Sequence, residues 1–199
     1  PTPNDNFVER AAALRSGDGF VVACHPQQYD SGPENVTAAA EPLHAFEIYN
    51  GLRELRGLTE ATNIELWDEM LTAGKQIWGI AADDFHFAFM SPGHGWVCVQ
   101  VPEEERDITW SLIVDQLKAG AFFASTSPHF TKIVLEGNEL QVGADSFVER
   151  LQVIGPGGAV LHQVAGDNMI WQCQPGLTYF RIEAIAGIKR AWSQPLYPA

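Results

Sequence analysis

Positive charge is scarce in this chain of 199 residues. Twelve lysines and arginines stand against 25 aspartates and glutamates, which gives a formal net charge of −13 at pH 7. Nucleic-acid backbones and anionic membrane surfaces both bind proteins through clustered lysine and arginine. The composition therefore argues against nucleic acid and against a membrane as partners.

Long apolar runs and paired cysteines are also missing. No stretch approaches the roughly 18 to 20 apolar residues that a membrane-spanning helix requires, and the first ten residues, PTPNDNFVER, lack the pattern of a secretion signal. The three cysteines, Cys24, Cys98 and Cys173, are odd in number and isolated, which favours reduced thiols over disulfides. These features predict a cytoplasmic protein. Because the chain begins without methionine, we expect that residues ahead of Pro1 were removed or left out.

The first 127 residues alternate short apolar runs with helical patterns. Apolar runs of this kind, separated by helices, predict an α/β layer with a mostly parallel sheet. We expect strands at 19–24, 44–50, 76–82, 96–101 and 121–125, and helices at about 4–17, 62–73 and 107–120.

After Pro128 the pattern changes to six or seven short runs separated by turn residues, which predict a small β-sandwich. The segment GPGG (155–158) joins two of these runs, and we expect a hairpin turn there because no helix follows it, as a phosphate-binding loop would require. The sequence thus predicts two domains, an α/β domain at 1–127 and a β-sandwich at 128–199.

Polar residues stand at the ends of three predicted strands, and parallel sheets bind ligands at the carboxyl ends of their strands. His25 follows the first strand, Glu47 and Asn50 close the second, and Asp84 and His86 follow the third. Side chains two positions apart share one face of a strand. Two imidazoles and a carboxylate suit Zn²⁺ or Mn²⁺, so His25, Asp84 and His86 are candidate metal ligands and Glu47 a candidate site-lining residue.

Each of these residues also has a structural interpretation, which the spacing leaves open. His25 is compatible with an ordinary loop residue, Asp84 with an Asx turn, and Glu47 with an ion pair to lysine or arginine. Among their neighbours, Cys24 alternates away from His25 and is expected to be a small buried thiol. His94, in the loop SPGHGW, is expected to be a solvated loop residue, with a role in a loop over the site as the alternative.

Several segments, in this order, resemble the second half of a PHP (polymerase and histidinol phosphatase) domain, closest to its carbaryl-hydrolase-like branch. They are GFVVACHP, HAFEIYNG, ELWDEMLTAGKQIWGIAADDFH, GWVCVQV and ITWSLIVDQLKAGAFFASTSP, and YFRIEAIAGIKRAWSQPLYP is similar to the small β-domain that closes such proteins. The resemblance implies the C-terminal part of a distorted (β/α)7 barrel followed by a β-sandwich. It also implies two or three divalent metal ions (Zn, Mn or Fe) at the strand ends.

By position, His25 matches the metal-binding histidine of the family's His-Pro motif, and Asp84 and His86 match its terminal Asp-x-His ligands. Glu47 matches an acid beside the site. The family's opening His-x-His strand and a later Asp-His pair have no counterpart, since the 24 residues ahead of His25 contain no histidine. We therefore expect a homo-oligomer, a missing N-terminal half, or a domain that has lost its metals.

The resemblance implies a metal-dependent hydrolase in which a metal-activated water attacks a small-molecule ester. Phosphoesters, carbamates and carboxylic esters all remain candidate substrates, and no residue is assigned as general acid. The alternative is a non-catalytic domain that keeps the PHP scaffold for assembly or ligand binding.

Overall fold

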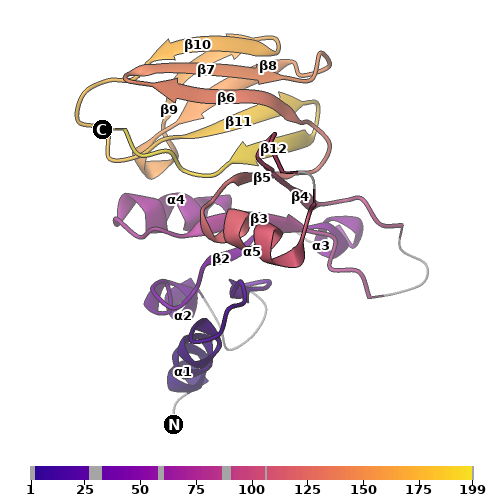
Figure 1. Cartoon of the computed structure of the whole chain (residues 1–199), viewed down its shortest axis with the longest axis vertical. Helices are drawn as coiled ribbons and strands as arrows, with labels where there is room; N and C mark the ends of the chain where they lie inside the picture. The colour runs from indigo at the N-terminus through magenta and orange to yellow at the C-terminus, as the bar shows by residue number, and fades with distance from the viewer. Residues whose placement is uncertain (1–2, 27–32, 58–60, 87–90, 106, 199) are drawn as a thin grey trace.

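The computed structural model describes residues 3–26, 33–57, 61–86, 91–105 and 107–198. Figure 1 shows a stack of antiparallel strands at one end of the molecule and the two N-terminal helices at the other, with a parallel sheet between them. The elements of the first part are α1 (Pro3–Arg15), β1 (Val22–Ala23), α2 (Pro33–Ala38), β2 (Ala45–Asn50), α3 (Gly51–Leu55), α4 (Ile64–Thr72) and β3 (Trp78–Ala82).

The parallel sheet has the order β1-β2-β3. The strands predicted at 44–50 and 76–82 and the helix predicted at 62–73 are confirmed as β2, β3 and α4, whereas β1 is shorter than its apolar run. Phe46 and Ile48 of β2 are fully buried in the core, together with Trp67 of α4. The indole Nε1 of Trp67 donates to the backbone oxygen of Ile77 at 3.0 Å, which fixes α4 against the sheet.

At the outer edge of this sheet, the side chain of Gln194 hydrogen-bonds to β3. Gln194, which is buried, donates from Nε2 to the backbone oxygen of Gly79 at 2.8 Å and accepts from its backbone N–H at 2.9 Å. The amide therefore satisfies the same two groups of β3 that a neighbouring strand would pair with. In the described part of the chain, the parallel sheet ends at β3.

The remaining elements form two antiparallel sheets, ordered β10-β7-β6 and β4-β5-β12-β11-β8-β9. They enclose a second core whose fully buried members include Leu140, Leu151 and Ile182, consistent with the β-sandwich expected after Pro128. The hairpin predicted at GPGG is confirmed, because it joins the antiparallel strands β8 and β9. The elements are β4 (Trp96–Val99), α5 (Trp110–Lys118), β5 (Phe122–Ser125), β6 (Phe130–Glu136), β7 (Glu139–Ala144), β8 (Arg150–Ile154), η1 (Pro156–Gly158), β9 (Val160–Ala165), β10 (Asn168–Gln172), β11 (Arg181–Ala186) and β12 (Lys189–Ser193).

The predicted fold class, the C-terminal part of a distorted (β/α)7 barrel, is wrong. Of the twelve strands that the structure describes, nine lie in antiparallel sheets. The strands predicted at 96–101 and 121–125 exist as β4 and β5, but they pair antiparallel with each other, and β5 pairs antiparallel with β12. An apolar run reports burial and not strand direction, and here the distant strand β12 determines the direction of β5. The six-stranded sheet thus contains strands from both sides of residue 127.

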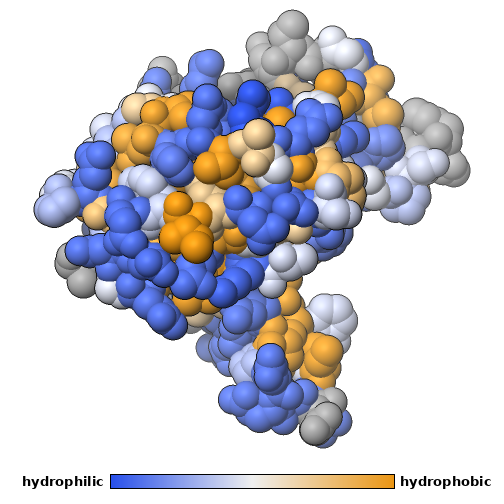
Figure 2. Space-filling view, turned by 90° about the horizontal axis from the view of Figure 1, so that it is seen from above, coloured by the Kyte–Doolittle hydropathy of each residue, from blue (hydrophilic) through white to orange (hydrophobic). Residues whose placement is uncertain are grey.

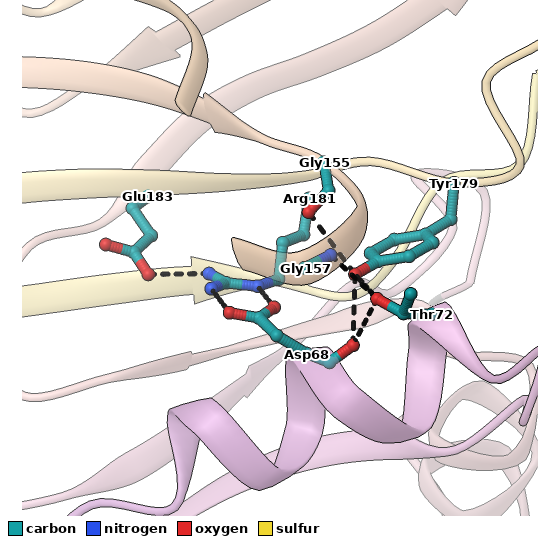
Figure 3. Close-up of polar contacts among 7 residues, drawn as sticks. All are labelled: Asp68, Thr72, Gly155, Gly157, Tyr179, Arg181 and Glu183. Atoms are coloured by element: carbon teal, nitrogen blue, oxygen red, sulfur yellow. Dashed lines mark hydrogen bonds and ion pairs between the residues drawn. The ribbon is translucent and has the colours of Figure 1, made fainter. Parts of the chain in front are cut away.

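A buried ion pair joins α4 to the antiparallel sheets (Figure 3). The guanidinium of Arg181, on β11, is 1% exposed and makes two parallel bonds of 2.8 Å to the carboxylate of Asp68 on α4. Its third nitrogen, Nη1, donates to Glu183 Oε1 at 2.6 Å. The same guanidinium lies 5.3 Å from the ring centroid of Trp67. The contact between the two halves of the molecule therefore contains a buried ion pair of defined geometry beside apolar packing, in which Ala124 and Trp192 belong to the same core as Trp67.

A second group of hydrogen bonds surrounds this pair. Thr72, on α4, accepts at Oγ1 from the backbone N–H of Gly157 at 2.7 Å, and its hydroxyl lies 3.2 Å from that of Tyr179. The Tyr179 hydroxyl also lies 3.3 Å from the backbone oxygens of Asp68 and Gly155. These contacts fix the turn η1 on the C-terminal half of α4 (Figure 3).

The surface is predominantly hydrophilic in the view from above, with small groups of hydrophobic side chains among the polar ones (Figure 2). In the ranges that the structure describes, no helix has the length and apolar character needed to cross a membrane.

Candidate functional site

Five polar residues meet at the carboxyl ends of the three parallel strands, and we call them the strand-end cluster: His25, Glu47, Asn50, Asp84 and His86. Glu47 Oε2 accepts the backbone N–H of His25 at 2.7 Å and the side-chain amide of Asn50 at 3.0 Å. The same Asn50 amide donates to Asp84 Oδ2 at 3.1 Å, and Asp84 Oδ1 lies 3.1 Å from His86 Nδ1. Because the strands are parallel and adjacent, residues up to 61 positions apart form one continuous set of contacts.

Asn50 is the central residue of the cluster. It is fully buried at the end of β2, and its Oδ1 accepts the backbone N–H of Arg53 at 3.0 Å, which caps the N-terminus of α3. Its Nδ2 contacts two carboxylates, those of Glu47 and Asp84. The sequence placed Asn50 at a strand end but gave it no role. The signal that could have found it is the step from strand to helix at Asn50–Gly51, where asparagine is a preferred cap.

Glu47 is an acid held inside the protein, with 2% of its surface exposed. Burial raises the pKa of Glu47, the hydrogen bonds from Asn50 and from the His25 backbone lower it, and the negative charge of Asp84 raises it again, with an upward shift as the net result. Two carboxylates joined through one amide create a region of negative potential, which favours a cation.

The backbone is strained at two members of the cluster. His25 and Asp84, with φ of 33° and 52°, are the two non-glycine residues of the described ranges that have positive φ. This conformation costs on the order of 1 kcal/mol or more and is concentrated at functional sites. Both residues begin the segments that leave a parallel strand, so the strain lies where His25 and Asp84 turn out of the sheet.

Asp83 holds a neighbouring loop against the cluster. Its carboxylate accepts the backbone N–H groups of Gly93, His94 and Gly95 at 2.8, 2.6 and 2.9 Å. Burial raises the pKa of Asp83, but the three N–H bonds outweigh it and lower the pKa overall. His94 packs so closely on Gly51 that a Cβ on this glycine would lie 2.7 Å from that of His94. His94 is therefore half-buried beside the cluster and not fully solvated.

Cys24 also differs from its prediction. It is exposed, because Val21 and Ala23 are the buried residues of this segment and the alternation places Cys24 on the less buried side, with Val22. Partial burial of the thiol, together with the negative charges of Glu47 and Asp84, raises the pKa of Cys24. The group therefore stays a thiol at neutral pH and is a poor nucleophile.

The donor types of the cluster fit a divalent ion of the zinc or manganese class, for which imidazole and carboxylate are normal ligands. Asp84 and His86 supply one of each from a single strand end, at side-chain exposures of 16% and 60%. Within the described ranges, no three side chains of His, Cys, Asp or Glu lie close enough together to form a metal-binding group. In the described cluster, Asp84 and His86 are therefore two adjacent potential ligands. His25 lies beside Glu47, on the neighbouring strands.

Comparisons of the chain with models of known protein families, with curated proteins and with solved structures find no match. The candidate site therefore depends on three features of the cluster itself: its place at the ends of parallel strands, its continuous hydrogen bonding, and the strained backbone at His25 and Asp84.

Proposed function

We propose that the strand-end cluster is the active site of a metal-dependent ester hydrolase. Asp84 and His86 are the two adjacent metal ligands in this proposal, His25 would complete the site by approaching them when an ion binds, and Glu47 lines the site. The observation that carries it is the chain of contacts from Glu47 through Asn50 to Asp84 and His86, since it brings the candidate residues of separate strands to one sheet edge. The PHP resemblance supports the proposal, because it selects the same four residues.

A divalent ion held at this site would supply a Lewis acid for the ester and would lower the pKa of a bound water molecule. The protein's own residues position the ligands. Glu47 accepts the His25 backbone N–H and so orients the strained turn that presents this histidine. Asn50 donates to Asp84 and keeps its carboxylate in place. Asp83 holds the 93–95 loop beside the site through three backbone bonds.

The test is an assay of hydrolysis with the metal as the variable. The chain is incubated with Zn²⁺ or Mn²⁺ and assayed with a phosphomonoester, a phosphodiester, a carboxylic ester and an aryl carbamate, each releasing 4-nitrophenol or naphthol. We expect turnover of at least one class that EDTA abolishes and added metal restores. Absence of turnover for all four would contradict the proposal and favour a non-catalytic scaffold. Turnover that EDTA leaves unchanged would contradict it too, because hydrolysis would then not depend on a metal.

A further inference from the structure

A cavity of about 470 Å³ lies at the opposite edge of the parallel sheet, where β2 and β3 begin. His44, directly before β2, and Trp78, the first residue of β3, form part of its wall. Arg15 at the end of α1, Lys75 after α4 and Lys118 at the end of α5 also line it. Its volume is in the usual range of small-molecule sites, and it is separate from the strand-end cluster.

The cavity gathers positive charge in an acidic protein. Three of the chain's twelve lysines and arginines line it, whereas Glu41 is its one acidic lining residue among those described. Over the whole chain the acids outnumber the bases 25 to 12. Like charges brought together repel one another unless an opposite charge neutralises them. An excess of two positive charges around one cavity, three against one, therefore favours an anion inside it.

Two contacts hold Lys118 in place. Lys118 Nζ donates to the backbone oxygen of Asp18 at 2.5 Å, and the Trp78 indole donates to the backbone oxygen of Lys118 at 3.2 Å. Lys75 and Lys118 are both half-buried, so their side chains are already partly ordered. A ligand that binds groups ordered in advance loses less conformational entropy on binding.

The positive charge around this cavity affects the pKa of His44. The residue is buried, and its Nδ1 accepts the backbone N–H of Val21 at 2.9 Å. Burial and the positive charges of Arg15 and Lys118 lower the pKa of His44 to about 4. The imidazole is therefore neutral at pH 7 with its hydrogen on Nε2, which adds a hydrogen-bond donor to the residues that line the cavity.

We propose that this cavity binds a small organic molecule that bears a phosphate group. Arg15, Lys75 and Lys118 bind the phosphate, since guanidinium and ammonium groups are its usual partners and a dianion matches the excess of two positive charges. The volume exceeds that of a phosphate group alone, and Trp78 borders the space for the organic part. The site is independent of hydrolysis at the strand-end cluster.

Calorimetric titration with phenylphosphonate at about pH 8, where it is mainly a dianion, tests the proposal, because this compound carries an aromatic body and cannot be hydrolysed as an ester. The chain is kept metal-free with EDTA and at constant ionic strength. We expect one site with a dissociation constant below ~1 mM. Lys75→Gln should weaken binding about 10-fold, and Arg15→Gln combined with it about 100-fold, since removal of each ionic bond costs on the order of 1.4 kcal/mol. The backbone bond from Lys75 to Met70 is retained in these variants.

Two control variants make the outcome decisive. Lys132→Gln removes a lysine of β6, whose Nζ contacts Gln141, and should leave phenylphosphonate binding unchanged. Asp84→Asn alters the strand-end cluster and should leave it unchanged too. The proposal is overturned if no saturable binding occurs, if Lys75→Gln binds as well as the unmodified chain, or if Lys132→Gln or Asp84→Asn weakens binding as much as Lys75→Gln does.

Discussion

Replacing His86 by alanine is expected to lower metal-dependent ester hydrolysis by about 100-fold or more, because loss of a ligand removes several kcal/mol of stabilisation of the transition state. The fold should be unaffected. The His86 side chain is 60% exposed, and substitutions at exposed positions usually change stability by less than ~0.5 kcal/mol. The measurement is kcat/KM at saturating Zn²⁺ or Mn²⁺, with circular dichroism to verify folding.

His129 provides a matched control. It lies directly before β6, is 48% exposed, and faces Asp145 across 3.4 Å, so it forms an aspartate–histidine pair like that of Asp84 and His86. His129→Ala should retain full hydrolytic activity. Unchanged turnover in His86→Ala, or an equal loss in His129→Ala, would show that His86 has no specific part in hydrolysis.

Replacing Asp68 by alanine is expected to destabilise the folded protein by about 3–5 kcal/mol, the usual cost of removing one partner from a buried ion pair. Asp68 makes both 2.8 Å bonds to the guanidinium of Arg181, and Arg181 is 1% exposed. Among the described residues, Glu183 is then the one carboxylate that still contacts the Arg181 guanidinium. The measurement is the free energy of unfolding from urea titration. Glu69→Ala, at the exposed neighbouring position of α4, should change it by less than ~0.5 kcal/mol.

A triple variant separates this explanation from a general defect in α4. Replacing a whole buried ionic group by uncharged residues of similar volume is often tolerated, so Asp68→Leu with Arg181→Met and Glu183→Gln should be more stable than Asp68→Ala alone. If the triple variant loses at least as much stability as Asp68→Ala, the unpaired charge of Arg181 is not the cause.

Local sequence patterns were sufficient for many of the helices and strands. The apolar run at 44–50 and the helical period at 62–73 predict β2 and α4, because burial on one face leaves a periodic signature in the sequence. Strand direction leaves no such signature. The helix α5 between β4 and β5 suggested a parallel crossover, but β5 lies antiparallel to β12, almost 70 residues further along the chain. No pattern in the residues around β5 could show that it pairs with this distant strand.

The candidate site, too, could be predicted only in part from the sequence. The approach of Glu47 to Asp84 follows from two adjacent parallel strands, and parallel β2 and β3 could be expected from the sequence. The sequence does not show that Asn50 donates to both carboxylates, because this contact depends on the orientation of the side chains in the folded protein. Cys24 was misplaced because the sequence does not show which face of this strand is buried, and the buried face is that of Val21 and Ala23.

Metal binding by the chain tests the central claim most directly. Zinc and manganese are titrated calorimetrically into the unmodified chain, into Asp84→Asn and His86→Ala, and into the control Asp145→Asn. Asparagine tolerates the left-handed backbone at position 84, so the first variant removes charge without adding strain. The account predicts stoichiometric binding to the unmodified chain and to Asp145→Asn, and its loss in the other two variants. Equal binding by all four proteins, or no binding by any, would contradict a metal site at the strand-end cluster.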